Sequence, residues 1–154
     1  MWLSGASAAT VGPLFAGSPF APRMLGPELG AASALKACFG LQSKALPAIW
    51  ATLDAAARAY GVADALRGEL ARTGVDLGAQ LDAVERRASG KAWRWVGEME
   101  EAAATFAAVG LPAGFSKAAA ATYRQLAATD PAELAHPWGV RGDATQGAVA
   151  APEG

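Results

Sequence analysis

The chain has 154 residues, 53% of them hydrophobic, and a formal net charge of -1 at pH 7. This length suits one ordinary domain with its own core, and the near-neutral charge argues against a nucleic-acid surface, which would be basic. The single cysteine, Cys38, excludes an internal disulfide, and the absence of both an apolar run of about 18 residues and a positively charged leader predicts a cytoplasmic protein without a membrane span.

The first 28 residues predict a strand, a helix and a second strand. Residues 1–5 form a short apolar segment that ends in a turn, which indicates a buried strand. Ser7 is a suitable N-cap for a brief helix that ends at Phe15, and residues 23–25 fit another strand. Two strands do not make an independent sheet. We therefore expect both strands to belong to a larger sheet.

From Gly30 the pattern becomes helical, and residues 31–60 predict one long segment. Its apolar face consists of residues spaced by three and four, namely Leu46, Ile49, Trp50 and Leu53. Pro47 lies inside this segment, lacks an N–H and would clash with the carbonyl of Ser43. We therefore expect a kink or a break there. Gly61 has the position of a helix-ending glycine.

Further helices are predicted after Gly61, with no internal repeat. They cover residues 63–71, 77–88, 91–110 and 116–128. The expected fold is mainly α, a multi-helix bundle preceded by a short β-α-β segment. The large side chains expected to anchor its core are Trp50, Leu53, Leu66, Trp93, Trp95, Phe106, Phe115 and Tyr123. We expect residues 29–138 to form the helical domain and residues 139–154, rich in Gly, Ala and Pro, a disordered tail.

The segment 91–115, KAWRWVGEMEEAAATFAAVGLPAGF, is the most distinctive part of the chain. One face of its helix is an apolar stripe made of Trp95, Met99, Ala102, Ala103 and Phe106. Its acidic residues are either an acid/base cluster or a solvated face paired to Arg94 and Lys91, and we favour the second reading. They are Glu98, Glu100 and Glu101. The two tryptophans fit core or interface anchors better than a platform for a ligand ring.

Other candidate chemical groups are few. His136 has no second ligand at metal-binding spacing and is expected to be an exposed loop residue, so we predict no metal site. Cys38 has no histidine nearby in the sequence and is expected to be a small buried hydrophobic residue rather than a nucleophile. The chain also lacks the glycine-rich motifs of nucleotide-binding loops.

Lys36 is the strongest candidate for chemistry. It follows a glycine- and alanine-rich helix start in LGPELGAASALK, residues 25–36. The small residues around Gly30 allow a ligand or another backbone to approach closely. Desolvation at such a site would lower the pKa of Lys36 and suit it to acid/base work. The alternative is a surface lysine whose apolar stem covers the helix.

The same two segments carry a family resemblance. LGPELGAASALK resembles the start of the helical C-terminal domain of β-hydroxyacid dehydrogenases, where a glycine-rich turn leads to the catalytic lysine. The Trp-rich segment, followed by AAAATYRQLA, is similar to phosphogluconate-dehydrogenase-like, NAD-binding proteins in their C-terminal domain. The similarity covers roughly residues 1–128.

This resemblance implies a 6-phosphogluconate dehydrogenase C-terminal-domain-like bundle in an NAD(P)-dependent oxidoreductase. Residues 1–28 would be the end of a Rossmann domain, and the bundle would complete the substrate pocket and form a homodimer. Lys36 would be the catalytic acid/base for a small hydroxy acid, with Gly30, Ser33 and Glu98 beside the substrate. NAD or NADP would bind in the complete enzyme, and we expect none to bind this chain alone, because the glycine-rich pyrophosphate turn is missing.

Two departures from the family pattern concern polar contacts. Family members commonly carry Asn four residues after the lysine, and often Asn or His three residues after it. Phe39 and Gly40 stand there in this chain. Gly97 and Glu98 occupy the place of a Lys-Asp pair. Substrate recognition is therefore expected to differ.

Three origins fit the missing front, namely a domain of a longer dehydrogenase, a truncated product, or a stand-alone module. The alternative function, from a different class, is a non-catalytic interaction module that dimerises through Trp93 and Trp95.

Overall fold

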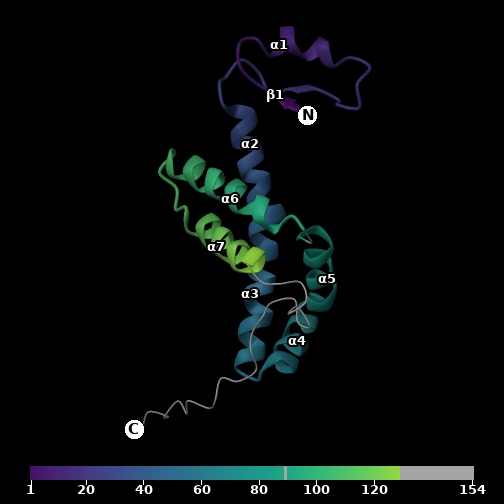
Figure 1. Cartoon of the computed structure of the whole chain (residues 1–154), viewed down its shortest axis with the longest axis vertical. Helices are drawn as coiled ribbons and strands as arrows, with labels where there is room; N and C mark the ends of the chain where they lie inside the picture. Colours follow the sequence, from purple (N-terminus) through teal and green to yellow (C-terminus); the bar gives the residue numbers. More distant parts are fainter. Residues whose placement is uncertain (89, 129–154) are drawn as a thin grey trace.

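The computed structural model describes residues 1–88 and 90–128, and this part of the chain is mainly α-helical (Figure 1). Its elements in chain order are β1 (Trp2–Leu3), α1 (Ala8–Val11), η1 (Gly12–Phe15), β2 (Arg23–Met24), α2 (Ala31–Gly40), η2 (Leu41–Ala45), α3 (Leu46–Ala59), α4 (Ala63–Arg72), α5 (Leu77–Ala88), α6 (Ala92–Ala107) and α7 (Gly114–Ala128). No helix among the described residues has the length and apolar character needed to cross a membrane.

A long helical column, α2–η2–α3, forms the axis of the molecule, with α6 and α7 on one side and α4 and α5 on the other (Figure 1). Of the kink or break expected at Pro47, the break does not occur, because α2, η2 and α3 follow one another without a gap. The segment η2 is a π-helical turn in which the N–H of Leu46 donates to the carbonyl of Leu41, and Pro47 then lies in the first turn of α3. Because a proline needs no N–H in a first turn, the wider π turn lets the chain remain helical.

The N-terminal unit, residues 1–28, has the predicted strand–helix–strand order. β1 and β2 are parallel, with Trp2 opposite Arg23 and Leu3 opposite Met24. Two expectations fail here. Ser7 makes no side-chain capping bond to α1, and β1 is not buried, because Trp2 is 43% exposed.

A side-chain hydrogen bond joins the N-terminal unit to the start of the long helix. Gly30 is the N-cap of α2, with φ of 87°, and has no side chain to cap the helix. The N–H of Ala32 donates instead to Oγ of Ser4, at 3.0 Å. Ser4 therefore supplies the oxygen that an N-cap residue normally provides.

The core lies where α6 and α7 pack together against α2 and η2. Met99 and Tyr123 are its largest fully buried side chains, and the predicted stripe on α6 faces it. The Tyr123 hydroxyl donates to the carbonyl of Lys44 in η2 at 2.6 Å, and its ring meets Trp95 edge-on at 5.0 Å. Two expected anchors are wrong, because Trp93 and Phe115 are 67% and 66% exposed.

The lower part of the molecule, α3 to α5, is joined by a buried carboxylate. Asp54 of α3 is 1% exposed. Its Oδ2 lies 2.6 Å from Nε of Arg58, and its Oδ1 lies 3.4 Å from an Nη atom of Arg67 on α4. Leu77 and Val84 of α5 are also buried. The two arginines balance the charge that α3 carries inward.

Candidate functional site

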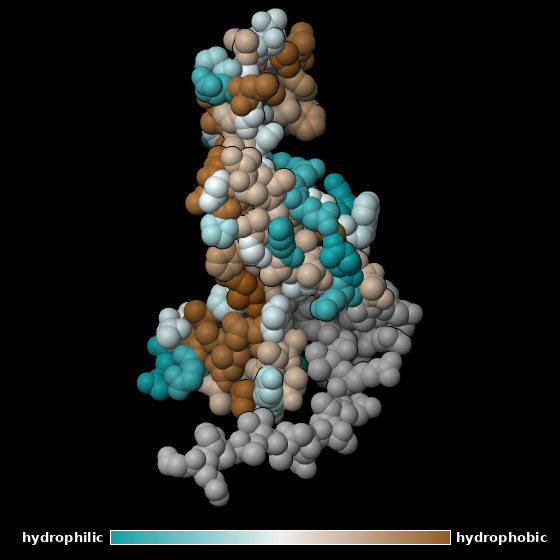
Figure 2. Space-filling model, turned by 90° about the vertical axis from the view of Figure 1, so that its left-hand side faces the viewer, coloured by the Kyte–Doolittle hydropathy of each residue, from teal (hydrophilic) through white to brown (hydrophobic). Residues whose placement is uncertain are grey.

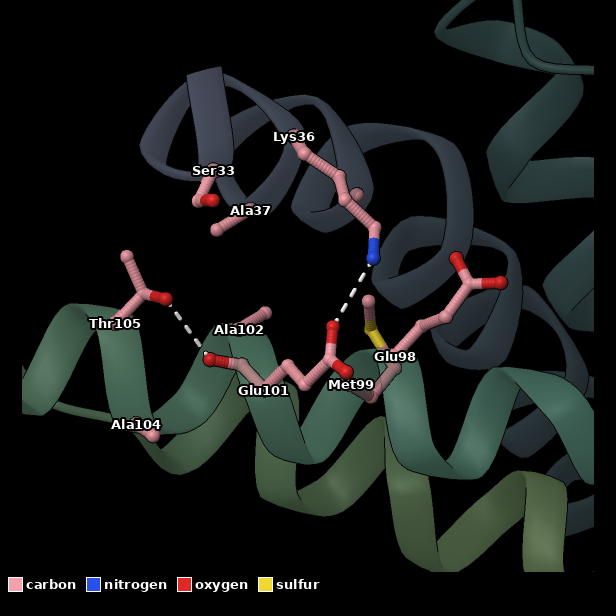
Figure 3. A pocket seen from close by; sticks show the side chains of 10 residues that line it. Ser33, Lys36, Ala37, Glu98, Met99, Glu101, Ala102, Ala104 and Thr105 are labelled. Carbon is pink, nitrogen blue, oxygen red and sulfur yellow. Dashed lines mark hydrogen bonds and ion pairs between the residues drawn. The ribbon is translucent and has the colours of Figure 1, made fainter. Parts of the chain in front are cut away.

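A pocket of about 440 Å³ lies between α2 and α6 (Figure 3). Helix α2 supplies its small and basic side chains, whereas α6 supplies the carboxylates. The lining consists of Ser33, Lys36, Ala37, Gly40, Glu98, Met99, Glu101, Ala102, Ala104 and Thr105. Three of the four residues that the sequence placed at a substrate site, Ser33, Lys36 and Glu98, are therefore together, and Gly30 does not line the pocket.

Lys36 reaches across the pocket from α2 to α6. Its Nζ lies 3.0 Å from Oε2 of Glu101, and Figure 3 shows the amine and this carboxylate pointing toward each other. The side chains of Lys36 and Glu101 are 62% and 71% exposed. The desolvation that we expected at Lys36 is therefore not provided by the described residues. Its amine is open to a ligand, and Glu101 holds it in place.

The packing of α2 against α6 explains why position 40 carries a glycine. A Cβ at this position would lie 3.2 Å from Cε of Met99, which is tighter than an ordinary contact. The absent side chain lets α2 approach α6 closely. A glycine at position 40 therefore fits the tight crossing of the two helices.

Glu98 forms a different ion pair from the one that helical spacing predicts. Its Oε2 lies 2.9 Å from Nζ of Lys44, and the two side chains are only 29% and 19% exposed. The Lys44 ammonium also lies 5.9 Å from the centre of the Trp95 ring, within cation–π range. The expected partnership of Glu98 with Arg94 is therefore wrong. The carboxylate instead links α6 to the π turn.

The other two glutamates of α6 likewise pair with other helices. Glu100 lies 2.7 Å from an Nη atom of Arg124 on α7, and Glu101 pairs with Lys36 on α2. The predicted partners on the same helix, Arg94 and Lys91, do not occur in these ion pairs. Glu100 and Glu101 are exposed, as the predicted solvated face requires, but their partners lie on other helices rather than on α6.

Other sequence candidates give no second site. Cys38 is exposed, not buried as expected, because the face of α2 that carries it points away from α6. His136 and the expected tail, residues 139–154, lie outside the described residues. Among the residues that are described, no group of three His, Cys, Asp or Glu side chains is placed to hold a metal ion.

The N-terminal unit does not fit a dinucleotide. The turn after β1 has one glycine with positive φ, Gly5, and leads into α1, which has only four residues. A pyrophosphate site needs a glycine-rich turn and the N-terminus of a full helix. NAD(P) would therefore have to be held by residues other than 1–28.

Sequence reasoning missed two residues that organise this region. Lys44 was not singled out, although its carbonyl, ammonium and helical turn connect Tyr123, Glu98 and Trp95. Burial raises the pKa of the Tyr123 phenol above its ordinary value. Asp54 was also missed. Its only sequence signal is an acidic residue on the predicted apolar side of a helix with Arg58 four residues later.

The chain is similar to a family model and to a solved structure. Residues 57–126, from the end of α3 to α7, match the family model of DUF1932, a domain of unknown function. Among solved structures, a conserved hypothetical protein from Sinorhizobium meliloti 1021 is similar, with a TM-score of 0.71 and 27% sequence identity. The match covers 84% of this chain but 44% of that protein. No curated protein matches.

Proposed function

We propose that this chain is the C-terminal substrate-binding and dimerisation part of an NAD(P)-dependent oxidoreductase that resembles hydroxyacid dehydrogenases. The DUF1932 match supports this assignment, because that domain is the C-terminal helical domain of NAD-binding, 6-phosphogluconate-dehydrogenase-like proteins. The observation that carries the proposal is the pocket in which Ser33, Lys36 and Glu98 meet. The resemblance implies a catalytic lysine at position 36, and position 36 lines the pocket.

The pocket suits a small hydroxy acid. Its volume of about 440 Å³ lies within the range of small-molecule sites. A substrate carboxylate would compete with Glu101 for the Lys36 ammonium, while the hydroxyls of Ser33 and Thr105 offer hydrogen bonds. In the proposed reaction the Lys36 ammonium first releases a proton to water, and the neutral amine then accepts the proton of the substrate hydroxyl during oxidation; in the reverse direction the ammonium returns this proton to the carbonyl oxygen as it is reduced.

NAD or NADP would take up the hydride, held by a nucleotide-binding part outside residues 1–28. The parallel pairing of β1 and β2 around a helical crossover supports such a part, because parallel strands belong to sheets covered on both faces. Phe20 and Met24 of this unit are 55% and 44% exposed, which leaves apolar surface for such sheet neighbours.

A homodimer would use the opposite end of the bundle. Apolar residues gather low on the face drawn in Figure 2, in the part of the molecule below α6 and α7. A groove of about 320 Å³ between α3 and α7 is lined almost wholly by apolar atoms, including those of Ile49, Leu53 and Phe115. Exposed apolar patches of this kind mark interaction sites. We place the dimer contact at this groove rather than at Trp93.

The catalytic assignment is tested in the protein encoded by the complete reading frame. NAD(P)H formation is followed with a panel of small hydroxy acids. Lys36→Ala is expected to lower kcat by about 10²–10⁴-fold, the usual contribution of a positioned acid/base. Lys117→Ala, on α7 and away from the pocket, is the matched control. An unchanged rate for Lys36→Ala in a folded protein would remove the assignment.

If the chain is instead a non-catalytic interaction module, the competing function, dimerisation is its only activity. Light scattering measures the mass of the wild type, of Phe115→Glu in the groove and of Val109→Glu, which is also exposed but lies outside it. We expect Phe115→Glu alone to give a monomer. A dimer together with no turnover on any hydroxy acid would favour the interaction module, and a wild-type monomer would contradict the groove assignment.

A further inference from the structure

A second cleft, of about 650 Å³, lies where η2 faces the junction of α5 and α6. It borders the Lys36 pocket only at Glu98, which lines both. Five cationic side chains and one carboxylate line it. They are Lys44, Arg86, Arg87, Lys91, Arg94 and Glu98.

The charge of this cleft is not neutralised by its surroundings. Lys44 pairs with Glu98, which leaves four cations. Within the described part of the chain, none of Arg86, Arg87, Lys91 and Arg94 takes part in an ion pair. The whole chain has a net charge of -1, so this concentration of positive charge is local. A concave surface of one sign attracts counter-ions strongly.

One of the two helix ends at the cleft adds to its positive charge. Lys91 and Arg94 lie at the N-terminus of α6, whereas Arg86 and Arg87 lie in the last turn of α5, where cations are favoured. Lys91 is the N-cap of α6, makes no side-chain capping bond, and is followed by a first turn without an acidic residue. The N-terminus of a helix carries positive partial charge, so Lys91 and Arg94 are unfavourably placed there. An anion at this point would offset the repulsion and meet the helix N-terminus.

We propose that the cleft binds the phosphate group of a small molecule. Arginine side chains match phosphate oxygens in bidentate geometry, and two or more of them around one cavity suit a doubly charged group better than a single carboxylate. The cleft volume admits a ligand of metabolite size. Four basic side chains without an ion pair gather in this hollow, whereas a nucleic acid would need a basic stripe along the surface.

The test measures inorganic phosphate binding by calorimetry and by the shift in Tm, at constant ionic strength. The wild type is expected to bind at one saturable site. The double variant Arg87→Gln/Arg94→Gln is expected to bind at least about tenfold more weakly, since each lost charge-assisted hydrogen bond costs that order. The variant Arg72→Gln/Arg124→Gln removes the same charge at exposed positions outside the cleft and is expected to bind like the wild type.

Glu98→Gln gives an opposite prediction. It removes the one carboxylate of the lining and releases Lys44, so phosphate binding is expected to tighten by about fivefold. Equal affinity in the two double variants, or no saturable binding by the wild type, would overturn the proposal. Glycerol phosphate is expected to bind at least as well as phosphate. Tighter binding to vesicles of phosphatidylcholine and phosphatidate would assign the phosphate to a lipid headgroup, and preferential binding of duplex DNA would contradict the small-molecule site.

This site stands apart from the proposed dehydrogenase function. Lys36 does not line the cleft, so Lys36→Ala is expected to leave phosphate affinity unchanged. Loss of hydride transfer without loss of phosphate binding, or the reverse, would therefore separate the two proposals.

Discussion

The helical body, residues 31–128, and the N-terminal unit differ in how each treats its apolar side chains. The body buries Met99, Val84 and Tyr123 almost completely. The N-terminal unit, of comparable apolar content, leaves Trp2 and Phe20 about half exposed and stands beyond the end of α2 (Figure 1). The core formed by α2, η2, α6 and α7 holds the body together. The N-terminal unit depends on the pairing of β1 with β2 and on the hydrogen bond that Ser4 accepts from Ala32. The comparison indicates that most of the buried apolar side chains that stabilise the fold lie in the body, whereas the N-terminal unit keeps large apolar side chains at its surface.

Removing the centre of the body has the largest expected effect. Tyr123→Ala deletes a fully buried ring and its hydrogen bond to Lys44, which should lower the free energy of unfolding by about 3–5 kcal/mol. Urea denaturation followed by circular dichroism measures the change. The effect should cover all helices of the body at once, and a loss confined to α7 would contradict a single cooperative core.

The buried carboxylate at the far end of the body comes next. Asp54→Asn leaves Arg58 and Arg67 without their charged partner and should cost about 2 kcal/mol, because both arginines keep access to water. Arg124→Gln, which breaks the exposed pair with Glu100, is the control and should change stability by less than about 0.5 kcal/mol. Similar losses for both variants would show that Asp54 does not stabilise the body.

Alkaline pH tests the burial of Tyr123 in the body without removing any side chain. In the unfolded chain Tyr123 ionises near its ordinary pKa of 10.0, whereas burial raises its pKa in the folded state. Below pH 10 both states keep the proton and nothing is lost. Above it the unfolded state alone releases the proton, so stability should fall by about 1.4 kcal/mol per pH unit relative to Tyr123→Phe. Parallel urea midpoints for the two proteins above pH 10 would contradict this.

The smallest expected effect is that of a substitution within the N-terminal unit. Ser4→Ala removes the oxygen that caps α2 and should cost about 1 kcal/mol in local stability. Hydrogen exchange should quicken in residues 1–32, while the thermal unfolding of the body stays unchanged. Ser7→Ala is the matched control, since Ser7 makes no capping bond. Faster exchange throughout α6 and α7 would mean that the two regions are one cooperative unit.

Local sequence patterns predicted most of the helices. The bounds of α5 agree with the prediction, and those of α4, α6 and α7 differ by a few residues, because periodic apolar positions and glycine stops are local signals. The helix break predicted at Pro47 does not occur, and nothing in the local sequence pattern indicates the π turn that precedes it. Trp93 and Phe115 failed as anchors because size alone does not say which face of a helix meets the core.

The candidate site was predictable only in part. The segment around Lys36 pointed to the pocket, and the family resemblance named Ser33, which lines it. The partners of the α6 carboxylates were not predictable, because Lys44 and Arg124 come from distant segments that only the folded chain brings near. The pairing of Asp54 was not predictable for the same reason, because its partner Arg67 lies on a different helix, α4. Spacing rules predict which side chains are neighbours on one helix, but they do not predict which side chains of another helix they contact.

The π turn at residues 41–45 sets the angular phase of everything that follows it. Each residue of an α-helix turns the chain by about 100°, and the π turn absorbs one residue beyond the regular repeat. Lys36 and the groove residue Ile49 therefore point in directions that an unbroken α-helix would not give them. Deleting Gln42 would keep the composition of the helix almost intact but rotate α3 relative to α2. Within this column, one surplus residue decides which neighbours each half of the helix meets.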